Sequence, residues 1–314
     1  NTPMKLSGPA AGSDLVKTAA DPNGTDCLGT FNNCGAGRTP WGTYLTCEEN
    51  FNGYFGTTNA EFKMPADYKR YGIAAETRYA YEKFDERFDV AKNPNEPRRA
   101  GYVVEIDPSN ATSVPVKRTA LGRIKHENAA VVVARDGRVV VYMGDDERGE
   151  FLYKFVSKGI YVPGGETSGL LDEGTLYVAK FNEDGTVDWL PLVQGQGPLT
   201  AENGFASQAD VVIHARLAAD ALGATKMDRP EDVQPNPKSG KVYCMLTNNS
   251  KRKDEQVDAA NPRGDNKFGH IIEITETDMD FAATKSRWEV LLKCGDPSVA
   301  EVGASFSTET TDNG

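Results

Sequence analysis

The sequence repeats one plan three times, and this repetition limits the folds that the chain can adopt. In each copy a polar group precedes a hairpin, and a second polar cluster follows the returning strand. The copies run over residues 32–50, 126–147 and 229–250. The next strand also repeats, since 101–107 (GYVVEID) resembles 269–275 (GHIIEIT). Repeated antiparallel units separated by long insertions are typical of propeller blades. We therefore expect an all-β fold, a β-propeller with helical insertions.

Turn signals support this β assignment. The 314 residues include 31 Gly and 17 Pro, which favours a turn-rich β architecture over a helical bundle. Asp136-Gly137 and Asp184-Gly185 are pairs that tight hairpins prefer. We read residues 1–37 as loop-like. The predicted strands are 41–47, 101–107, 129–134, 139–143, 151–156, 176–181, 187–192, 241–246, 270–275 and 288–292.

One helix interrupts the strands. Ser207 and Asp210 form the spacing of a capping box, an apolar face follows, and Gly223 ends the helix. His214 lies inside it, where a core or surface histidine is the ordinary interpretation. Residues 60–92 mix aromatics with alternating charges, which predicts short helices in a surface insertion.

Acidic side chains occupy equivalent positions of the repeats. Glu127 and Glu231 precede two hairpins, while Cys47-Glu48 and Asp145-Asp146 follow two returning strands. Because the inner strands of a propeller converge on one channel, we expect these side chains to meet in space. Like charges held this closely need cations between them. Only 3 His are present, so oxygen ligands favour calcium, magnesium or ferric iron.

Each of these features also has an ordinary structural interpretation. An Asp-Asp-Glu sequence after a strand is most often a solvated turn, and single glutamates are most often surface residues. Cys47 within a β run is typical of a small buried hydrophobic residue. Arg229 beside Glu231 is consistent with a plain salt bridge. The repeat favours a metal site over these alternatives without excluding them.

Charge and hydropathy exclude two classes of protein. The net charge of −11 disfavours nucleic-acid binding, which needs a basic surface. No apolar run approaches the roughly 20 residues of a membrane-spanning helix. The 5 cysteines are odd in number, and whether Cys27 and Cys34 pair stays open. The chain begins Asn1-Thr2-Pro3 without Met, so we expect a processed or partial chain.

Longer segments of the chain resemble the PhoX family of alkaline phosphatases. They are TPWGTYLTCEEN (39–50), RIKHEN (123–128), YMGDDER (142–148), YKFV (153–156), MDRPED (227–232) and LTNN (246–249). The resemblance implies a six-bladed β-propeller. Family members are much longer, so about half of the propeller is present here. Residues 1–314 would then form a partial β-propeller domain, with a mixed insertion at about 55–98 and a helical insertion at about 200–226.

The same resemblance implies a site and an activity. An iron–calcium cluster, Fe³⁺ with Ca²⁺, would lie in the propeller channel. The implied metal ligands are Cys47, Glu127 and Glu231, with Glu48 a further one. The implied catalytic residue is Arg229, which contacts the phosphate.

Family members remove phosphate from monoesters outside the cytoplasm, after twin-arginine export. The implied location is therefore the periplasm or the secreted fraction. The implied partners are small phosphate monoesters and the missing C-terminal part of the propeller, with no nucleic acid and no membrane insertion.

Two other classes of function remain open at this point. One is a calcium-dependent propeller hydrolase of another class, such as a lactonase, which would use no iron. The other is a non-catalytic propeller that serves as a binding module, which would hold no metal and turn over no ester.

Overall fold

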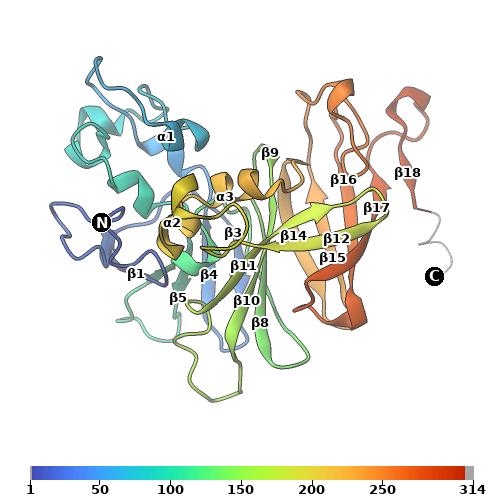
Figure 1. Cartoon of the computed structure of the whole chain (residues 1–314), viewed down its shortest axis with the longest axis horizontal. Helices are drawn as coiled ribbons and strands as arrows, with labels where there is room; N and C mark the ends of the chain where they lie inside the picture. The colour runs from blue at the N-terminus through green and yellow to red at the C-terminus, as the bar shows by residue number, and fades with distance from the viewer. Residues whose placement is uncertain (1, 308–314) are drawn as a thin grey trace.

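The structure, a computed structural model, describes residues 2–307 and is mostly β with few helices (Figure 1). The first sheet contains, in spatial order, β2 (Asp26–Leu28), β1 (Pro3–Ser7), β6 (Val116–Arg118), β5 (Val103–Ile106), β4 (Tyr44–Glu48) and β3 (Asn33–Arg38). The second contains β14 (Pro230–Asn236), β15 (Lys241–Leu246), β16 (His270–Glu276), β17 (Lys285–Lys293), β12 (Thr186–Pro191), β11 (Gly174–Phe181), β10 (Leu152–Ile160), β8 (Arg138–Gly144) and β7 (Ala130–Val133). β18 (Ser305–Phe306) pairs with β17, and β9 (Arg148–Glu150) pairs with β13 (Met227–Asp228).

A four-stranded antiparallel run recurs three times within these sheets. The runs are β3–β4–β5–β6, β7–β8–β10–β11 and β14–β15–β16–β17. β12 joins the second run to the third by pairing with both β11 and β17. β7 contacts both β3 and β14, so the first strands of the three runs are neighbours. The repeat in the sequence therefore corresponds to a repeat of strands.

Glycines allow these first strands to approach one another closely. A Cβ atom added at Gly35 would overlap the carbonyl oxygen of Glu127, and one at Gly37 would overlap that of Ala129. A strand built this way lacks the β-branched residues that usually mark strands in a sequence. The prediction of a loop over residues 1–37 is wrong, since this segment holds β1, β2 and all but the last residue of β3, and the glycines explain why β3 was missed.

The other predicted strands are confirmed, with shifts of a few residues at their ends. Both predicted hairpins form, and their turns place Gly137 at φ 89° and Gly185 at φ 77°. These are left-handed backbone conformations that glycine adopts at little cost. The Asp-Gly signal therefore located both turns.

The predicted helix is divided into α2 (Gln208–Ile213) and α3 (Ala215–Leu222). The capping box at Ser207 is confirmed, and Gly223 ends α3 at φ 68°. The division falls at His214, which has non-helical dihedral angles. The carbonyl oxygen of Val212 accepts from Arg123 N at 2.8 Å, and that of Ile213 accepts from the Tyr71 hydroxyl at 3.2 Å. These outside donors replace helical hydrogen bonds, so one continuous helix was the wrong expectation.

Residues 55–98 lie to one side of the sheets, in the blue-to-cyan segment at the upper left of Figure 1. The segment holds α1 (Ala66–Arg70) and packs on an aromatic cluster that includes Phe31, Phe51 and Tyr68. Short 3₁₀ turns cover Phe51–Tyr54, Tyr81–Lys83, Glu86–Phe88, Glu96–Arg99, Thr119–Leu121, Ala201–Asn203, Asp254–Gln256, Thr277–Met279 and Ala300–Val302.

None of the helices within residues 2–307 has both the length and the apolar character needed to cross a membrane. The five cysteines are all unpaired, so Cys27 and Cys34 do not form a disulfide. The largest core cluster packs the first run of strands against the second, with α3 covering it.

Candidate functional site

Polar side chains, only some of which were singled out in the sequence, gather where the first strands of the three runs begin. Cys34 lies at the start of β3, Glu127 precedes β7, and Glu231 lies at the start of β14. Glu49 follows the end of β4 and Asp146 follows the end of β8. Because β3 and β4, and likewise β7 and β8, are antiparallel, these beginnings and ends meet at one edge.

Three of these side chains form a compact group of potential metal ligands. One ligand atom each from Cys34, Glu49 and Glu127 lies within 4.8 Å of the other two. The Cys34 thiol donates to Oε1 of Glu127 at 3.3 Å. Burial, followed by the hydrogen bond and charge of Glu127, raises the pKa of Cys34 to about 12. Burial and then the charges of Asp146 and Glu127 raise the pKa of Glu49 to about 7.

Arg229 joins two more carboxylates to this group. Its Nη2 lies 2.8 Å from Oδ2 of Asp146 and 2.9 Å from Oε1 of Glu231. Thr247 Oγ1 also donates to Oε1 of Glu231, at 2.7 Å. The other oxygen of Asp146, Oδ1, is buried without a hydrogen-bond partner in the described part of the chain. A buried carboxylate oxygen left in this way is a candidate ligand for a cation.

The electrostatics link the two groups into one site. Burial raises the pKa of Glu127, and the charges of Asp146 and Glu231 raise it further. Burial also raises the pKa of Asp146, although the hydrogen bond and charge of Arg229 oppose this. Four carboxylates, those of Glu49 and the three just named, thus lie near one guanidinium group and near the ammonium group of Lys125, which is itself paired with Glu147. This excess of negative charge is unfavourable without cations.

The donor set fits a cation of hard or borderline character. Carboxylate oxygens are the ligands that calcium prefers, whereas a single thiol among them suits iron better than calcium. The residues present therefore fit the iron and calcium that the sequence resemblance implies.

Arg229 itself is held in a strained conformation. Its φ of 60° lies in the left-handed region, which is unusual for a residue with a side chain. The residue connects β13 to β14, and its carbonyl oxygen accepts from Thr247 N at 3.3 Å. Strain of this kind is retained mainly at functional positions, where the surrounding structure enforces it. It directs the guanidinium toward Asp146 and Glu231.

Two of the predicted ligands, Cys47 and Glu48, are not members of the compact group of three. Cys47 is fully buried in the core with Leu45 and Val103. Burial, followed by the charges of Glu127 and Cys34, raises the pKa of its thiol, so Cys47 borders the ligand group from the core side. Glu48 is fully buried on the opposite side of β4, where both its oxygens are engaged. They accept from the backbone N–H groups of Phe31 (3.0 Å), Gly101 (2.8 Å) and Tyr102 (3.1 Å) and from Lys117 Nζ (2.7 Å). The structure thus brings Glu127, Glu231 and Arg229 together, with the Cys47 thiol within electrostatic range of Glu127, whereas the carboxylate of Glu48 is engaged by Lys117 and backbone N–H groups.

The sequence analysis did not single out Cys34 and Glu49, although the repeat contains the signal for both. In the first copy, Asn32-Asn33-Cys34 occupies the place that His126-Glu127-Asn128 occupies in the second. Glu48-Glu49 likewise corresponds to Asp145-Asp146. In both copies the first acid is buried in a salt bridge and the second faces the site.

A buried network of ion pairs holds one of the site's segments in place. Arg216 of α3 is fully buried and binds Asp145 through Nε (2.7 Å) and Nη2 (2.5 Å), and Glu147 through Nη1 (2.9 Å). Lys125 pairs with Glu147 at 3.0 Å. These pairs fix the segment 145–147, and with it the carboxylate of Asp146. No local sequence pattern indicates Arg216, because its partners lie far away in the chain.

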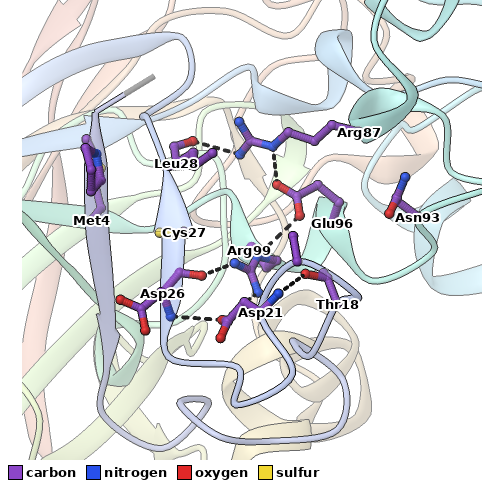
Figure 2. Close-up of a pocket in the computed structure, with 12 residues that line it drawn as sticks. Met4, Thr18, Asp21, Asp26, Cys27, Leu28, Arg87, Asn93, Glu96 and Arg99 are labelled. Atoms are coloured by element: carbon purple, nitrogen blue, oxygen red, sulfur yellow. Dashed lines mark hydrogen bonds and ion pairs between the residues drawn. The ribbon is translucent and has the colours of Figure 1, made fainter.

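A pocket of about 380 Å³ lies at a different place, beside β1 and β2 (Figure 2). Its charged groups are paired with one another. Arg87 Nε binds Glu96 at 2.5 Å, and Arg99 Nη1 binds Asp21 at 3.1 Å. None of the predicted site residues lines this pocket. It is therefore separate from the candidate site.

Comparisons with known proteins identify the family of the chain. No curated protein matches the chain. A solved structure described as "Pseudomonas fluorescens PhoX in complex with vanadate, a transition state analogue" is 52% identical, with a TM-score of 0.92. The match covers 95% of this chain and 54% of that one, so the chain spans about half the length of this relative. The family model described as alkaline phosphatase PhoX matches residues 1–314. The chain therefore belongs to the PhoX alkaline phosphatase family.

Proposed function

We propose that the protein carrying this chain hydrolyses phosphate monoesters and releases inorganic phosphate at the site described above. The observation that carries the proposal is the meeting of Cys34, Glu49 and Glu127 beside Arg229 in a chain of this family. The solved relative is described as binding vanadate, a transition-state analogue. Because this chain spans about half of that relative, the activity of the whole protein is part of the proposal.

We further propose that the three four-stranded runs are blades of a β-propeller. Each run is an antiparallel meander, and the first strands of the runs are neighbours, as the inner strands of blades are. A longer chain would supply the remaining blades and the acidic residues that complete the ring.

The proposed metal centre contains ferric iron and calcium. Cys34, Glu49 and Glu127 would hold iron or calcium from one side, with Asp146 and Glu231 on the other. When bound, such cations supply Lewis-acid chemistry, because they neutralise the charge of a phosphate ester. Cys47 and Glu48, which the sequence resemblance implies as ligands, stay a prediction.

Arg229 would bind the phosphate group of the substrate. Both of its carboxylate partners contact the same atom, Nη2. Within residues 2–307 no acceptor engages its Nε or Nη1, and its side chain is 27% exposed. These two groups point to different sides of the guanidinium, and each is free to donate a charge-assisted hydrogen bond to a phosphate oxygen. Asp146 and Glu231 would then keep Arg229 oriented while the substrate enters.

The proposal places the protein outside the cytoplasm, in the periplasm or secreted, after twin-arginine export. This location rests on the family alone. Its test is separate from that of the activity, namely the compartment in which the protein carrying this chain is found.

Three variants of the protein carrying this chain test the activity. We expect Glu127→Ala and Glu231→Ala to lose bound metal and phosphate release together. We expect Arg229→Ala to keep its metal, while its affinity for inorganic phosphate falls at least about tenfold, as loss of a charge-assisted pair predicts. Metal is measured by elemental analysis, phosphate release by a colorimetric assay, and phosphate affinity by calorimetry.

Glu183→Ala is the matched control, because Glu183 is exposed on the hairpin between β11 and β12. Wild-type turnover by Glu231→Ala would remove this ligand from the proposal. Full activity in an iron-free protein would favour the calcium-dependent hydrolase of another class.

A further inference from the structure

A cluster of three tyrosines lies beside the candidate site and has no part in the proposed chemistry. Tyr54 and Tyr81 stack with their rings inclined by 16° and their centroids 5.5 Å apart. Tyr79 lies against both, with centroids 4.7 Å from Tyr54 and 6.0 Å from Tyr81. We call Tyr54, Tyr79 and Tyr81 the tyrosine rim. Tyr79 and Tyr81 come from the 55–98 insertion, and Tyr54 follows the segment that carries Glu49.

Hydrogen bonds connect the tyrosine rim to the ligand group. Asn32 Nδ2 donates to the Tyr79 hydroxyl at 3.3 Å. The backbone carbonyl of the same Asn32 accepts from Glu49 N at 3.2 Å. Cys34 follows two residues later in the chain and is exposed. The rim is therefore linked to Glu49 through Asn32 and to Cys34 through Asn32 and Asn33. Because Cys34, Tyr79 and Tyr81 are all exposed, we infer that the rim borders the solvent-facing entrance to the site.

The aromatic rings are open to solvent in spite of this packing. Tyr79 is 36% exposed and Tyr81 is 42% exposed. Rings that served only to anchor the insertion would be buried, as the neighbouring Phe55 and Tyr68 are. Phe88 also lies against Tyr81, with centroids 5.3 Å apart, so the exposed parts of Tyr79 and Tyr81 are what a planar aromatic group of a ligand can contact.

A free cation accompanies the rings. The guanidinium carbon of Arg78 lies 5.6 Å from the centroid of Tyr79. Arg78 is exposed, and no carboxylate within residues 2–307 pairs with it. An unpaired cation beside a site for a phosphate dianion attracts the substrate toward that site. The entrance thus combines an aromatic surface with a positive charge.

We propose that the tyrosine rim binds the planar aromatic part of the substrate, so that the site favours phosphate monoesters of nucleosides over monoesters of simple sugars. This inference rests on the proposed function, because it names the substrate class of the same site. The base would stack on Tyr79 or Tyr81 while the phosphate reaches Arg229.

A matched pair of substrates tests the inference in the protein carrying this chain. Adenosine 5′-monophosphate and ribose 5-phosphate carry the same phosphate on the same 5′ oxygen and differ in the base. We expect the wild-type protein to have a higher kcat/KM for the nucleotide. In Tyr79→Leu and Tyr81→Leu this ratio of kcat/KM values falls by a factor of about five or more, the value of one lost stacking contact.

Two further variants separate stacking from a structural role. Tyr79→Phe keeps the ring and loses the hydrogen bond to Asn32, so we expect it to retain the nucleotide preference. Tyr44→Leu is the control, because Tyr44 is an exposed tyrosine at the opposite end of β4 and is expected to leave both substrates unaffected. An equal loss on both substrates in Tyr79→Leu, or an unchanged ratio, would overturn the inference.

A binding measurement keeps this test independent of turnover. We expect adenosine to bind the wild-type protein in calorimetry and to bind Tyr79→Leu about fivefold or more weakly. Absence of adenosine binding to the wild-type protein overturns the inference. If adenosine binds through Tyr79 and yet neither ester is hydrolysed, the proposed function fails and the aromatic subsite stands.

Discussion

Glu48 provides the sharpest test of the difference between a metal ligand and a structural carboxylate. It is fully buried, and its partner Lys117 has a side chain that is 1% exposed. In Glu48→Gln the ammonium group of Lys117 stays buried without its counter-charge, which costs about 3–5 kcal/mol. The amide nitrogen must also face a backbone N–H that the carboxylate used to accept, at about 1–3 kcal/mol. The expected loss is therefore about 4–8 kcal/mol, against a total stability of about 5–15 kcal/mol for a typical domain.

Urea unfolding followed by circular dichroism measures this loss, and hydrogen exchange at the Gly101 and Tyr102 amides reports it locally. The double variant Glu48→Gln with Lys117→Met removes the unpaired charge, so we expect it to recover about 3–5 kcal/mol relative to Glu48→Gln alone. This recovery keeps the test informative if the single variant does not fold. If Glu48→Gln unfolds within about 1 kcal/mol of the wild type and loses its metal, the reasoning is refuted and Glu48 is a ligand.

Three other predictions follow from the site and its surroundings. Cys34→Ala is expected to lose bound iron while its unfolding free energy changes by less than about 0.5 kcal/mol, whereas Cys47→Ala is expected to keep iron and to lose roughly 1–3 kcal/mol of stability. Elemental analysis measures the iron and urea unfolding measures the stability. The opposite pattern would restore Cys47 as the ligand. Gly37→Ala places a Cβ atom against the Ala129 carbonyl oxygen, so we expect β3 to move away from β7 and the metal content to fall. Gly169→Ala is the control, because a Cβ atom at Gly169 meets open space. Equal metal content in both variants would contradict the close approach of β3 to β7. Hydrogen bonds from His214 and Arg98 outweigh burial and hold the pKa of Asp67 well below its usual range. The stabilising effect of the Asp67 carboxylate is therefore present above about pH 4 and is lost as the pH falls further. We expect the difference in unfolding free energy between wild type and Asp67→Asn to shrink below about pH 4, and a constant difference would refute the assignment.

The strands and turns of the chain were largely predictable from local sequence. Asp136-Gly137 and Asp184-Gly185 located two hairpins because a left-handed turn residue is a local requirement. The boundaries 241–246 of β15 follow from apolar alternation within the strand itself. In contrast, β3 was missed because its glycines are required by the close contact with β7, a strand that is distant in the sequence.

The candidate site was predictable in its chemistry and only partly in its members. Equivalent repeat positions indicated Glu127 and Glu231, and the family resemblance indicated Arg229. The choice between Glu48 and Glu49 depends on which side of β4 each carboxylate leaves, and on Lys117, which lies on β6. Adjacent acids look alike in a sequence, but one is neutralised by a buried amine and the other is left facing further carboxylates.

The sequence by itself determined the strand repeat, the acidic character of the site and the family of the chain, because repeat spacing and motif order are properties of the chain alone. Only the tertiary structure decided that the thiol of Cys34 donates to Glu127, that Arg216 supports Asp145 from a distant helix, and that a tyrosine of an insertion reaches Asn32. Each of these facts depends on contacts between segments far apart in the chain, where burial and charge pairing are settled by packing.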